Sequence, residues 1–368
     1  MKRKFVFLIH PRTIDDFYRR LGNMLGLREA AGMKFLPYLF PKPVAKWVLK
    51  RLRGRAGFTI CSHFRAGEEV EGYIIAILLT GDQMINLPHA FVRDRIIDAI
   101  IYARDVLGVE RVGLGAYTAP MTLGGYEVFR DKRFHFNKSK KSCRITHGDS
   151  LTSVAAVEAL KKGLTLKGRI FGDSIVGIVG AYGVVGRAAA ILTSELGPKK
   201  LILTGPNVRK LQEVRNEIAK TFQGEILTSQ DNSTVSEADA LILATSAPTD
   251  IISASMLKEN AVVVDMSQPV NMSKSVCEQR LDVLRIDGGF MHVPGVNLGF
   301  EMGPPAETTF ACLTETMVST IVGDQDNHIG QVDVNFAKRI FTEGQERGFV
   351  LAPLTNFSES IEKGGKKL

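Results

Sequence analysis

The chain has 368 residues, of which 45% are hydrophobic and 23% charged, and it carries a formal net charge of +8. Its length favours two domains with sizeable cores, and its composition is that of an ordinary globular protein. The excess of cations indicates an acidic partner without naming one.

Cysteines, histidines and apolar runs exclude several classes of protein. The four cysteines form no CxxC pair, which argues against a disulfide framework or a zinc site and fits a reducing cytoplasm. The seven histidines form no HxxxH or HExxH cluster, so we predict no structural metal. The apolar run Phe5–Ile9 is too short for a signal peptide, and Tyr73–Leu79 is far too short for a membrane span. We therefore predict a soluble cytoplasmic protein that has, at most, peripheral contact with a membrane.

The N-terminal part mixes short apolar runs with helical periodicity. Strands are predicted at Phe5–Ile9, Tyr73–Leu79 and Arg111–Leu114, and helices at Ile14–Leu25, Phe91–Leu107 and Ser150–Leu160. Lys161-Lys162-Gly163 is expected to close the last of these helices.

A basic amphipathic helix is predicted to begin near Pro43. Four cations recur at helical spacing, namely Lys42, Lys46, Lys50 and Arg53. The expected apolar face consists of Val44, Val48 and Leu52, with Trp47 beside it. Such a helix suits a membrane surface or an acidic carrier protein, and the alternative is a solvated face of a helix packed on its own domain. Nucleic acid is disfavoured because no known motif accompanies the charge.

From Ile170 onward, strands and helices alternate. The predicted strands are Ser174–Val179, Lys200–Thr204, Ala240–Thr245, Ala261–Asp265 and Val283–Ile286, and the predicted helices are Arg187–Leu196 and Val208–Phe222. This alternation predicts an α/β fold with a Rossmann-type doubly wound parallel sheet.

A glycine-rich loop lies between the first of these strands and its helix. It has the form GxxGxxG and comprises Gly180, Ala181, Tyr182, Gly183, Val184, Val185 and Gly186. Glycines allow a tight turn and close approach of a pyrophosphate, whose charge meets the helix N-terminus. The loop therefore predicts dinucleotide binding, and the alternative is a turn that binds nothing.

The end of the second strand indicates which dinucleotide is bound. An NAD site usually has an acidic residue there, but this stretch has none and instead contains Asn207, Arg209 and Lys210. We therefore predict NADPH as the cofactor, although both cations are also common as surface residues in a first helical turn. Later loops at the same sheet edge add Thr245, Ser246, Asp265 and Gly289 as candidate ligand contacts.

Cys312 is the candidate nucleophile. Pro305 and Gly323 predict a helix between them, with Cys312 near its start. The positive end of a helix favours thiolate, the form that attacks acyl groups. The alternative is a buried structural cysteine.

Several segments together resemble a known family. They are Phe5–His10, Gly113–Thr118, Thr146–Thr152, the GxxGxxG loop, Gly288-Gly289, Phe310-Ala311-Cys312 with Glu315, and Arg347-Gly348-Phe349. The chain thus resembles, almost end to end, the cyanobacterial-type long-chain acyl-(acyl-carrier-protein) reductases and their bacterial relatives, within the shikimate-dehydrogenase-like group.

The resemblance implies attack by Cys312 on a fatty acyl thioester, an acyl-cysteine intermediate and reduction by NADPH to a fatty aldehyde. Acyl carrier protein or acyl-CoA is the implied acyl donor. The chain departs from the family at Asp149, where an asparagine is usual, at Pro206, where an arginine is frequent, and in an insert over Lys34–Gly57.

Five further residues are candidates for a part in this chemistry. His10 and His147 are possible general acids or activators of the cysteine, and Glu315 can orient a neighbour. The hydroxyl of Ser150, like that of Thr152, is a candidate for stabilising an oxyanion. Each also has a structural alternative, as a core histidine, a capping hydroxyl or a solvent-facing glutamate.

Three functions remain distinct at this level. The first is an NADPH-dependent acyl-thioester reductase; the second is a shikimate-type dehydrogenase of a small polar alcohol, whose Asn-Val-Thr-x-Pro-x-Lys segment is missing here. The third is a nucleotide-binding module without chemistry. The expected organisation is a substrate and catalytic domain over 1–165, an NADP-binding domain over 166–294 and a C-terminal helical segment with the cysteine over 295–368.

Overall fold

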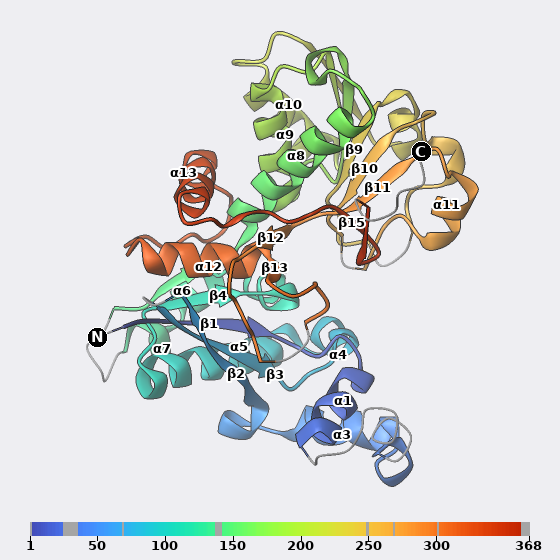
Figure 1. Ribbon diagram of the computed structural model, residues 1–368. Coiled ribbons are helices and arrows are strands. Elements are labelled where there is room, and N and C mark those ends of the chain that lie inside the picture. Colours follow the sequence, from blue (N-terminus) through green and yellow to red (C-terminus); the bar gives the residue numbers. More distant parts are fainter. Residues whose placement is uncertain are drawn as a thin grey trace. The chain divides into compact units, whose positions relative to one another are not determined.

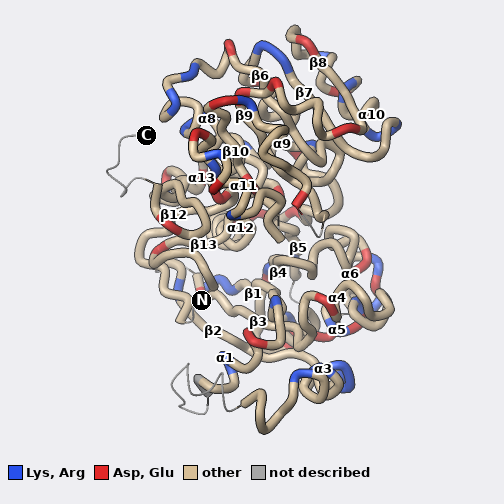
Figure 2. Tube along the Cα trace, turned by 90° about the vertical axis from the view of Figure 1, so that its right-hand side faces the viewer, with Lys and Arg blue, Asp and Glu red and all other residues tan. Residues whose placement is uncertain are grey.

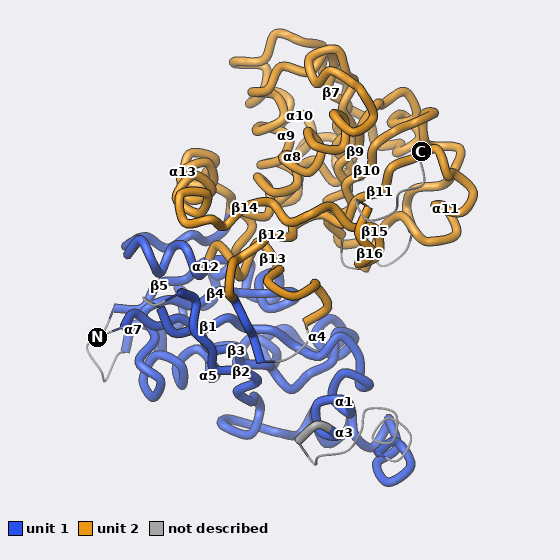
Figure 3. Tube along the Cα trace, in the orientation of Figure 1, with its two compact units in different colours: residues 1–147, 296–301, 316–330 blue, residues 148–295, 302–315, 331–368 orange. Residues whose placement is uncertain are grey.

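The computed structural model describes residues 2–24, 36–67, 70–136, 142–247, 250–267, 269–299 and 302–361. Leu25 and Lys34, which bound the predicted first helix and the insert, lie outside these ranges. The chain divides into two compact units, shown in two colours in Figure 3. The first comprises residues 1–147, 296–301 and 316–330, and the second comprises residues 148–295, 302–315 and 331–368. The division differs from the predicted three segments, because residues 295–368 are shared between both units.

The first unit contains a five-stranded sheet in the order β2-β3-β1-β4-β5 (Figure 1). Its strands are β1 Arg3–Ile9, β2 Phe58–Ala66, β3 Val70–Ile77, β4 Arg111–Leu114 and β5 Arg144–Thr146. All neighbours are parallel except β2 and β3. The sequence patterns missed β2, whose register shifts between Ile60 and Ser62 and so interrupts the alternation of buried and exposed residues.

The helices of the first unit are short apart from α5. They are α1 Ile14–Met24, α3 Lys42–Arg51, α4 Gly81–Asn86, α5 His89–Tyr102, α6 Tyr126–Arg130 and α7 Lys132–His135. Val92, Ile96 and Ile100 of α5 are fully buried in a core with the sheet residues Val6 and Ile75. Their spacing of four residues is the apolar stripe that predicted this helix.

The second unit contains a six-stranded, fully parallel sheet in the order β11-β10-β9-β6-β7-β8. Its strands are β6 Ile175–Val179, β7 Lys200–Thr204, β8 Glu225–Ser229, β9 Ala240–Leu243, β10 Val262–Asp265 and β11 Leu284–Asp287. This is the doubly wound Rossmann order, in which strands are added outward from β6 on one side and from its parallel neighbour β9 on the other. The predicted fold class is confirmed.

The helices of this unit are α8 Asp149–Leu166, α9 Val184–Glu195, α10 Val208–Ile218, α11 Lys274–Gln279 and α13 Val334–Gln345. Helix α8 does not end at Gly163 as predicted. A Cβ at Gly163 would lie 2.6 Å from Val262 Cγ1 and 2.8 Å from Ile286 Cδ1, so the glycine permits close packing of α8 on β10 and β11. Gly163, which predicted the end of the helix, instead allows the helix to pack closely on the sheet.

Two small antiparallel sheets complete this unit. One, in the order β13-β12-β14, contains β12 Phe290–His292, β13 Thr308–Phe310 and β14 Val350–Leu351, and the other pairs β15 Thr355–Asn356 with β16 Glu359–Ser360. Strand β13 leads directly into α12 Ala311–Ile321, whose first five residues belong to this unit. Among the described residues, no helix is long and apolar enough to cross a bilayer, and no three His, Cys, Asp or Glu side chains are grouped to hold a metal ion.

Candidate functional site

The glycine-rich loop is too tight for side chains at two of its glycines. Gly180 has φ of +82°, and a Cβ there would lie 2.5 Å from the carbonyl oxygen of Ala244. A Cβ at Gly186 would lie 2.1 Å from the carbonyl oxygen of Gly180. Helix α9 begins at Val184, earlier than predicted, and has no acidic residue in its first turn. The amides and the positive end of α9 thus suit a diphosphate.

A tyrosine ring and two cations lie at the end of β7. A Cβ at Gly205 would lie 2.7 Å from Cε1 of Tyr182, so the ring packs against this glycine. The ammonium of Lys210 lies 5.5 Å from the centre of the same ring. Arg209 pairs with Glu213 at 3.2 Å, but its side chain remains 90% exposed. Both cations therefore remain accessible to a ligand beside β7.

Asn207 has a structural task. Its Oδ1 accepts a hydrogen bond of 3.0 Å from the backbone N–H of Lys210 and caps α10. The cap fixes the direction in which α10 leaves β7, and it places Lys210 in the first turn.

The loops that follow β9 and β10 are tied together. Thr245 donates its hydroxyl proton to Oδ1 of Asn271 at 2.5 Å, while the backbone N–H of Asn271 donates to Asp265 at 3.0 Å. Burial raises the pKa of Asp265, although Arg285 lies 3.3 Å away. Ser246 is exposed. Thr245 and Asp265 therefore shape this edge of the sheet, and Ser246 remains available for contact.

Cys312 is the second residue of α12 and lies against the start of α8. The backbone N–H of Ala311 donates to the carbonyl of Gly289 at 2.7 Å, which anchors the start of α12 to the loop after β11. A Cβ at Gly148 would lie only 2.2 Å from Cβ of Cys312. Gly148 also has φ of +79°, a backbone conformation that favours glycine. Both this conformation and the close approach of Cys312 therefore require glycine at this position. The patterns did not mark Gly148, although it belongs to the segment Thr146–Thr152 that carries the resemblance.

Glu315 is buried and lies at the N-terminus of α8. Its side chain is fully inaccessible, and Oε2 accepts a hydrogen bond of 2.8 Å from the backbone N–H of Leu151. A carboxylate in this place satisfies one of the unpaired amides of the first turn and interacts favourably with the helix dipole. The solvent-facing alternative for Glu315 is wrong.

The thiol of Cys312 is not activated in the way the sequence predicted. The residue keeps intermediate exposure, but burial of the sulfur, followed by the charges of Asp149 and Glu315, raises its pKa to about 12. The prediction of a lowered pKa is therefore wrong in direction. A helix end contributes roughly 0.3–1 kcal/mol, which loses to desolvation together with two nearby carboxylates. Without a base or a change in its surroundings, this side chain is a thiol at neutral pH.

The two histidines belong to the first unit. The ring of His10 has Nδ1 at 2.9 Å from the carbonyl of Pro11, and its Nε2 accepts from the backbone N–H of Tyr117 at 3.3 Å. Burial lowers the pKa of His10, so it is a neutral residue that fixes the end of β1. His147 is buried directly before Gly148, and its backbone N–H donates to the carbonyl of His328 at 3.1 Å.

Of the two hydroxyls that were candidates for stabilising an oxyanion, that of Thr152 already donates a hydrogen bond within the helix. Thr152 donates to the carbonyl of Gly148 at 2.8 Å, and Ser150 is buried in the first turn of α8. The backbone amides near Cys312 and Gly289 remain the other candidates for stabilising an oxyanion.

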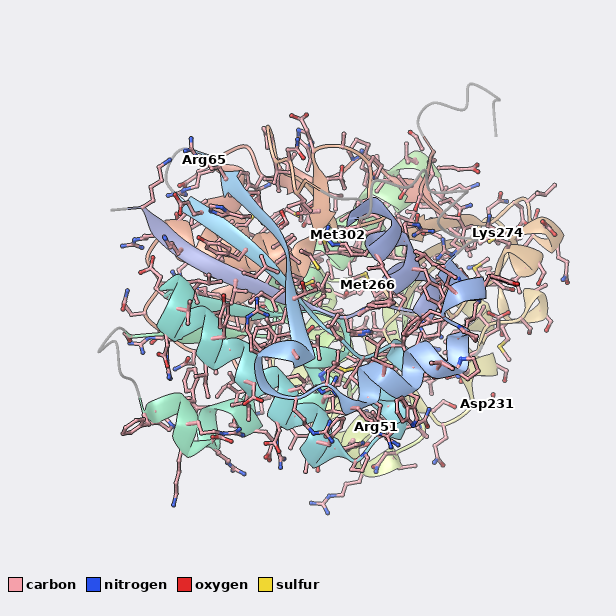
Figure 4. The ribbon with its side chains drawn as sticks, turned by 90° about the horizontal axis from the view of Figure 1, so that it is seen from below. Arg51, Arg65, Asp231, Met266, Lys274 and Met302 are labelled. Carbon is pink, nitrogen blue, oxygen red and sulfur yellow. The ribbon has the colours of Figure 1, made fainter. Side chains whose placement is uncertain are left out.

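The start of α8 connects the cysteine with the nucleotide loop. Ser153 is fully buried and lies with Oγ 3.4 Å from the carbonyl of Val185, the second residue of α9. Gly289 approaches both α8 and β10, since a Cβ there would lie 3.8 Å from Thr152 Cγ2 and 2.9 Å from Met266 Cε. Met266, labelled in Figure 4, follows β10 directly. The glycine-rich loop, Gly289 and Cys312 therefore adjoin the same two turns of α8.

Comparison with known proteins finds a family match over one segment of the second unit. Residues 165–288 match the family described as shikimate / quinate 5-dehydrogenase. Aminotransferase PigE of Serratia sp. (strain ATCC 39006) is 23% identical over 305 residues, which cover 81% of this chain and 34% of that protein. The chain thus spans about a third of the length of this relative.

Two solved structures to which the chain is similar have low sequence identity and TM-scores below 0.5. Shikimate 5-dehydrogenase from Listeria monocytogenes, in complex with shikimate and NAD, has 10% identity and a TM-score of 0.38, covering 92% of this chain and 96% of its own. The nucleotide-binding domain of glutamyl-tRNA reductase from Thermoplasma volcanium has 18% identity and a TM-score of 0.27, covering 36% of this chain and 84% of its own.

The matched segment has a clear consequence for the class of protein. Residues 165–288, about a third of the chain, include the parallel sheet and the glycine-rich loop, and this segment is similar to shikimate / quinate 5-dehydrogenases. The match supports an oxidoreductase that uses a nicotinamide dinucleotide, and it ends before Cys312.

Proposed function

We propose that the protein is a nicotinamide-dependent oxidoreductase that reduces a long-chain fatty acyl thioester to a fatty aldehyde, with Cys312 as the acyl-accepting residue and NADPH as the cofactor. The observation that carries this proposal is the position of Cys312. It lies in the first turn of α12 against Gly148, within the unit that holds the glycine-rich loop. The resemblance of the segment around Cys312 to acyl-(acyl-carrier-protein) reductases supports the same assignment.

The chemistry divides into two balanced steps. The sulfur of Cys312 attacks the thioester carbonyl, its proton passes to the departing thiolate, and the acyl group remains on the cysteine. NADPH, when bound, would supply a hydride to the acyl carbon; the bond from that carbon to the sulfur of Cys312 then breaks, the aldehyde leaves, and the sulfur regains a proton. The glycine-rich loop, the start of α9, Arg209 and Lys210 would hold the dinucleotide.

The raised pKa of the Cys312 thiol affects the first step, in which the sulfur attacks the thioester. The proton of Cys312 must be removed as the substrate binds, since burial and two carboxylates disfavour a free thiolate. His147, which directly precedes Gly148 in the chain, stays the sequence-based candidate for this proton transfer. A resting cysteine that is protonated until its substrate arrives is protected from adventitious alkylation and oxidation.

A second candidate is an NAD(P)-dependent dehydrogenase of a small polar alcohol, without a covalent intermediate. The family match over residues 165–288 favours this function. In this function Cys312 is not a nucleophile. The two candidate functions therefore differ in whether an acyl group becomes covalently bound to Cys312.

The test is intact-mass spectrometry of the full chain mixed with palmitoyl-CoA or palmitoyl-acyl carrier protein in the absence of dinucleotide. We expect an added mass of one acyl group, located on the peptide that contains Cys312. Cys277→Ala is the matched control, because Cys277 is another partly exposed cysteine of the same unit. Absence of acylation, combined with dinucleotide-linked oxidation of a polar alcohol that survives Cys312→Ala, would establish the second candidate instead.

A further inference from the structure

Five large apolar side chains lie exposed in and before α3. The "α3 patch" consists of Tyr38, Leu39, Phe40, Val44 and Trp47, all of them in the exposed class. Tyr38 is 84% and Trp47 55% exposed. Single exposed apolar residues are ordinary, but five within ten positions of the chain indicate an interaction surface.

The predicted apolar face of α3 is therefore only partly correct. The helix buries Ala45 and Leu49 in a small core with Ile14, Tyr18 and Leu36. Val44 and Trp47 of the predicted apolar face are exposed, whereas Ala45 and Leu49 pack against α1. Figure 1 shows α1 and α3 together at one end of the first unit.

The patch is held in place by the fold. The hydroxyl of Tyr18 donates to the carbonyl of Phe40 at 2.5 Å, and the backbone N–H of Ala45 donates to the carbonyl of Pro41 at 2.9 Å. Gln83 of α4 donates to the carbonyl of Lys46 at 2.8 Å. The exposed side chains thus project from an anchored helix and turn, so little ordering is needed when they bind.

The surroundings of the patch are strongly basic. Residues 36–57 contain six cations and no acidic residue, namely Lys42, Lys46, Lys50, Arg51, Arg53 and Arg55. Figure 2 shows the resulting concentration of Lys and Arg along α3. Arg51, at the end of α3 in Figure 4, stacks over the Trp47 ring at 3.7 Å. Aromatic rings next to long cationic side chains are typical of the water–lipid interface of a membrane.

An acidic carrier protein suits this surface less well than the sequence suggested. Of the four cations in the predicted docking stripe, Lys42 pairs with Asp15 at 2.9 Å and Lys46 with Asp82 at 2.8 Å. Arg53 donates to the carbonyl of Lys50 at 2.8 Å and lies over the Phe91 ring at 4.1 Å. These contacts occupy three of the four cations, whereas the apolar side chains have no role in electrostatic docking of a carrier.

We propose that the α3 patch is a peripheral docking surface for a lipid bilayer that contains anionic headgroups. The apolar side chains enter the boundary between headgroups and acyl chains, and Lys50 and Arg51 contact the lipid phosphates. Each buried apolar residue adds hydrophobic free energy, and each cation near an anionic surface contributes roughly 1 kcal/mol. The inference does not depend on the chemistry proposed for Cys312.

The experiment uses Trp47, the single tryptophan of the chain, as its own reporter. The full chain is titrated with vesicles made of equal parts phosphatidylcholine and phosphatidylglycerol, and tryptophan emission and co-sedimentation are recorded. We expect a blue shift of the emission, quenching by brominated acyl chains, and much weaker binding to vesicles of phosphatidylcholine alone. Unchanged emission with no co-sedimentation would overturn the proposal.

Two variants sharpen the experiment. Leu39→Asp should weaken partitioning about tenfold or more, and Lys50→Glu about fivefold at low salt, with the latter difference shrinking as salt is added. Leu281→Asp is the matched control, since Leu281 is 79% exposed in the other unit and should leave partitioning unchanged. Equal losses in all three variants would contradict the proposal, as would an emission shift caused by an acidic carrier protein and not by vesicles.

Discussion

Two helix N-termini in the second unit differ in what fills them. At α9, Gly183 precedes the helix and the first turn holds no acidic side chain. At α8, Asp149 is the first residue, and the buried carboxylate of Glu315 accepts from the amide of Leu151. The end of α9 is therefore suited to an external anion, whereas the end of α8 already has an internal one.

Burial is the largest cause of the raised pKa of Cys312, and this difference between the two helix N-termini adds to it. The carboxylate that stabilises α8 lies one helical turn from the cysteine on α12, and together with Asp149 it opposes a second negative charge. Helix termini are thus not interchangeable sources of activation. The anion that each one already holds decides whether it stabilises a ligand, a thiolate or only the helix.

The largest expected effect comes from removing the sulfur. Cys312→Ala should lower aldehyde formation by a factor of about a thousand or more, because no other group can carry the acyl intermediate. Dinucleotide affinity, measured by calorimetry, should change less than about twofold, since Cys312 lies outside the glycine-rich loop. Full turnover by the alanine variant would remove the cysteine from the mechanism.

A single methyl group at Gly186 should disrupt the glycine-rich loop at the N-terminus of α9. Gly186→Ala places a Cβ 2.1 Å from the carbonyl of Gly180, so dinucleotide affinity should fall about a hundredfold. Gly172→Ala is the matched control, because a Cβ there would meet its nearest neighbour at 3.7 Å. Equal affinity in wild type and Gly186→Ala, measured by cofactor fluorescence, would show that the loop does not bind the dinucleotide.

The buried carboxylate of Glu315 at the N-terminus of α8 can be replaced by a neutral amide of nearly the same shape. Glu315→Gln should reduce the free energy of unfolding by about 1–2 kcal/mol, because the charge on the acceptor of the Leu151 amide is lost. The same change should lower the pKa of the Cys312 thiol, because one of the two carboxylates that raise it is gone. Alkylation of the Cys312 peptide by iodoacetamide should therefore begin at lower pH than in wild type. An unshifted alkylation profile would mean that Glu315 does not raise the pKa of Cys312, which leaves burial and Asp149 as its causes.

The smallest effect concerns the choice of dinucleotide. Arg209→Ala and Lys210→Ala should each reduce kcat/KM with NADPH about threefold to tenfold and leave NADH nearly unaffected, since exposed cations contribute modestly to phosphate binding. The ratio of kcat/KM for the two dinucleotides is the quantity to measure. A wild-type ratio that favours NADH would contradict the assignment of NADPH.

The nucleotide-binding half could be predicted because its signals are local. Apolar runs such as Lys200–Thr204 are strands by themselves, and the loop at Gly180 needs only its own residues and the following helix. The surroundings of Cys312 could not, because Asp149 and Glu315 come from distant parts of the chain and meet only in the fold. The packing of α3 could not be predicted for a similar reason, since Ala45 and Leu49 are buried by residues of α1.

The most direct test asks whether an acyl group on Cys312, at the start of α12, is reduced by a dinucleotide bound at the start of α9. The chain is acylated with palmitoyl-CoA, freed of excess thioester, and mixed with NADPH that carries deuterium at the transferred position. The account predicts deuterated palmitaldehyde and a return of the protein to its unmodified mass. Retention of the acyl group, or its release as undeuterated palmitate, would contradict the claim that Cys312 and the dinucleotide loop act on the same substrate.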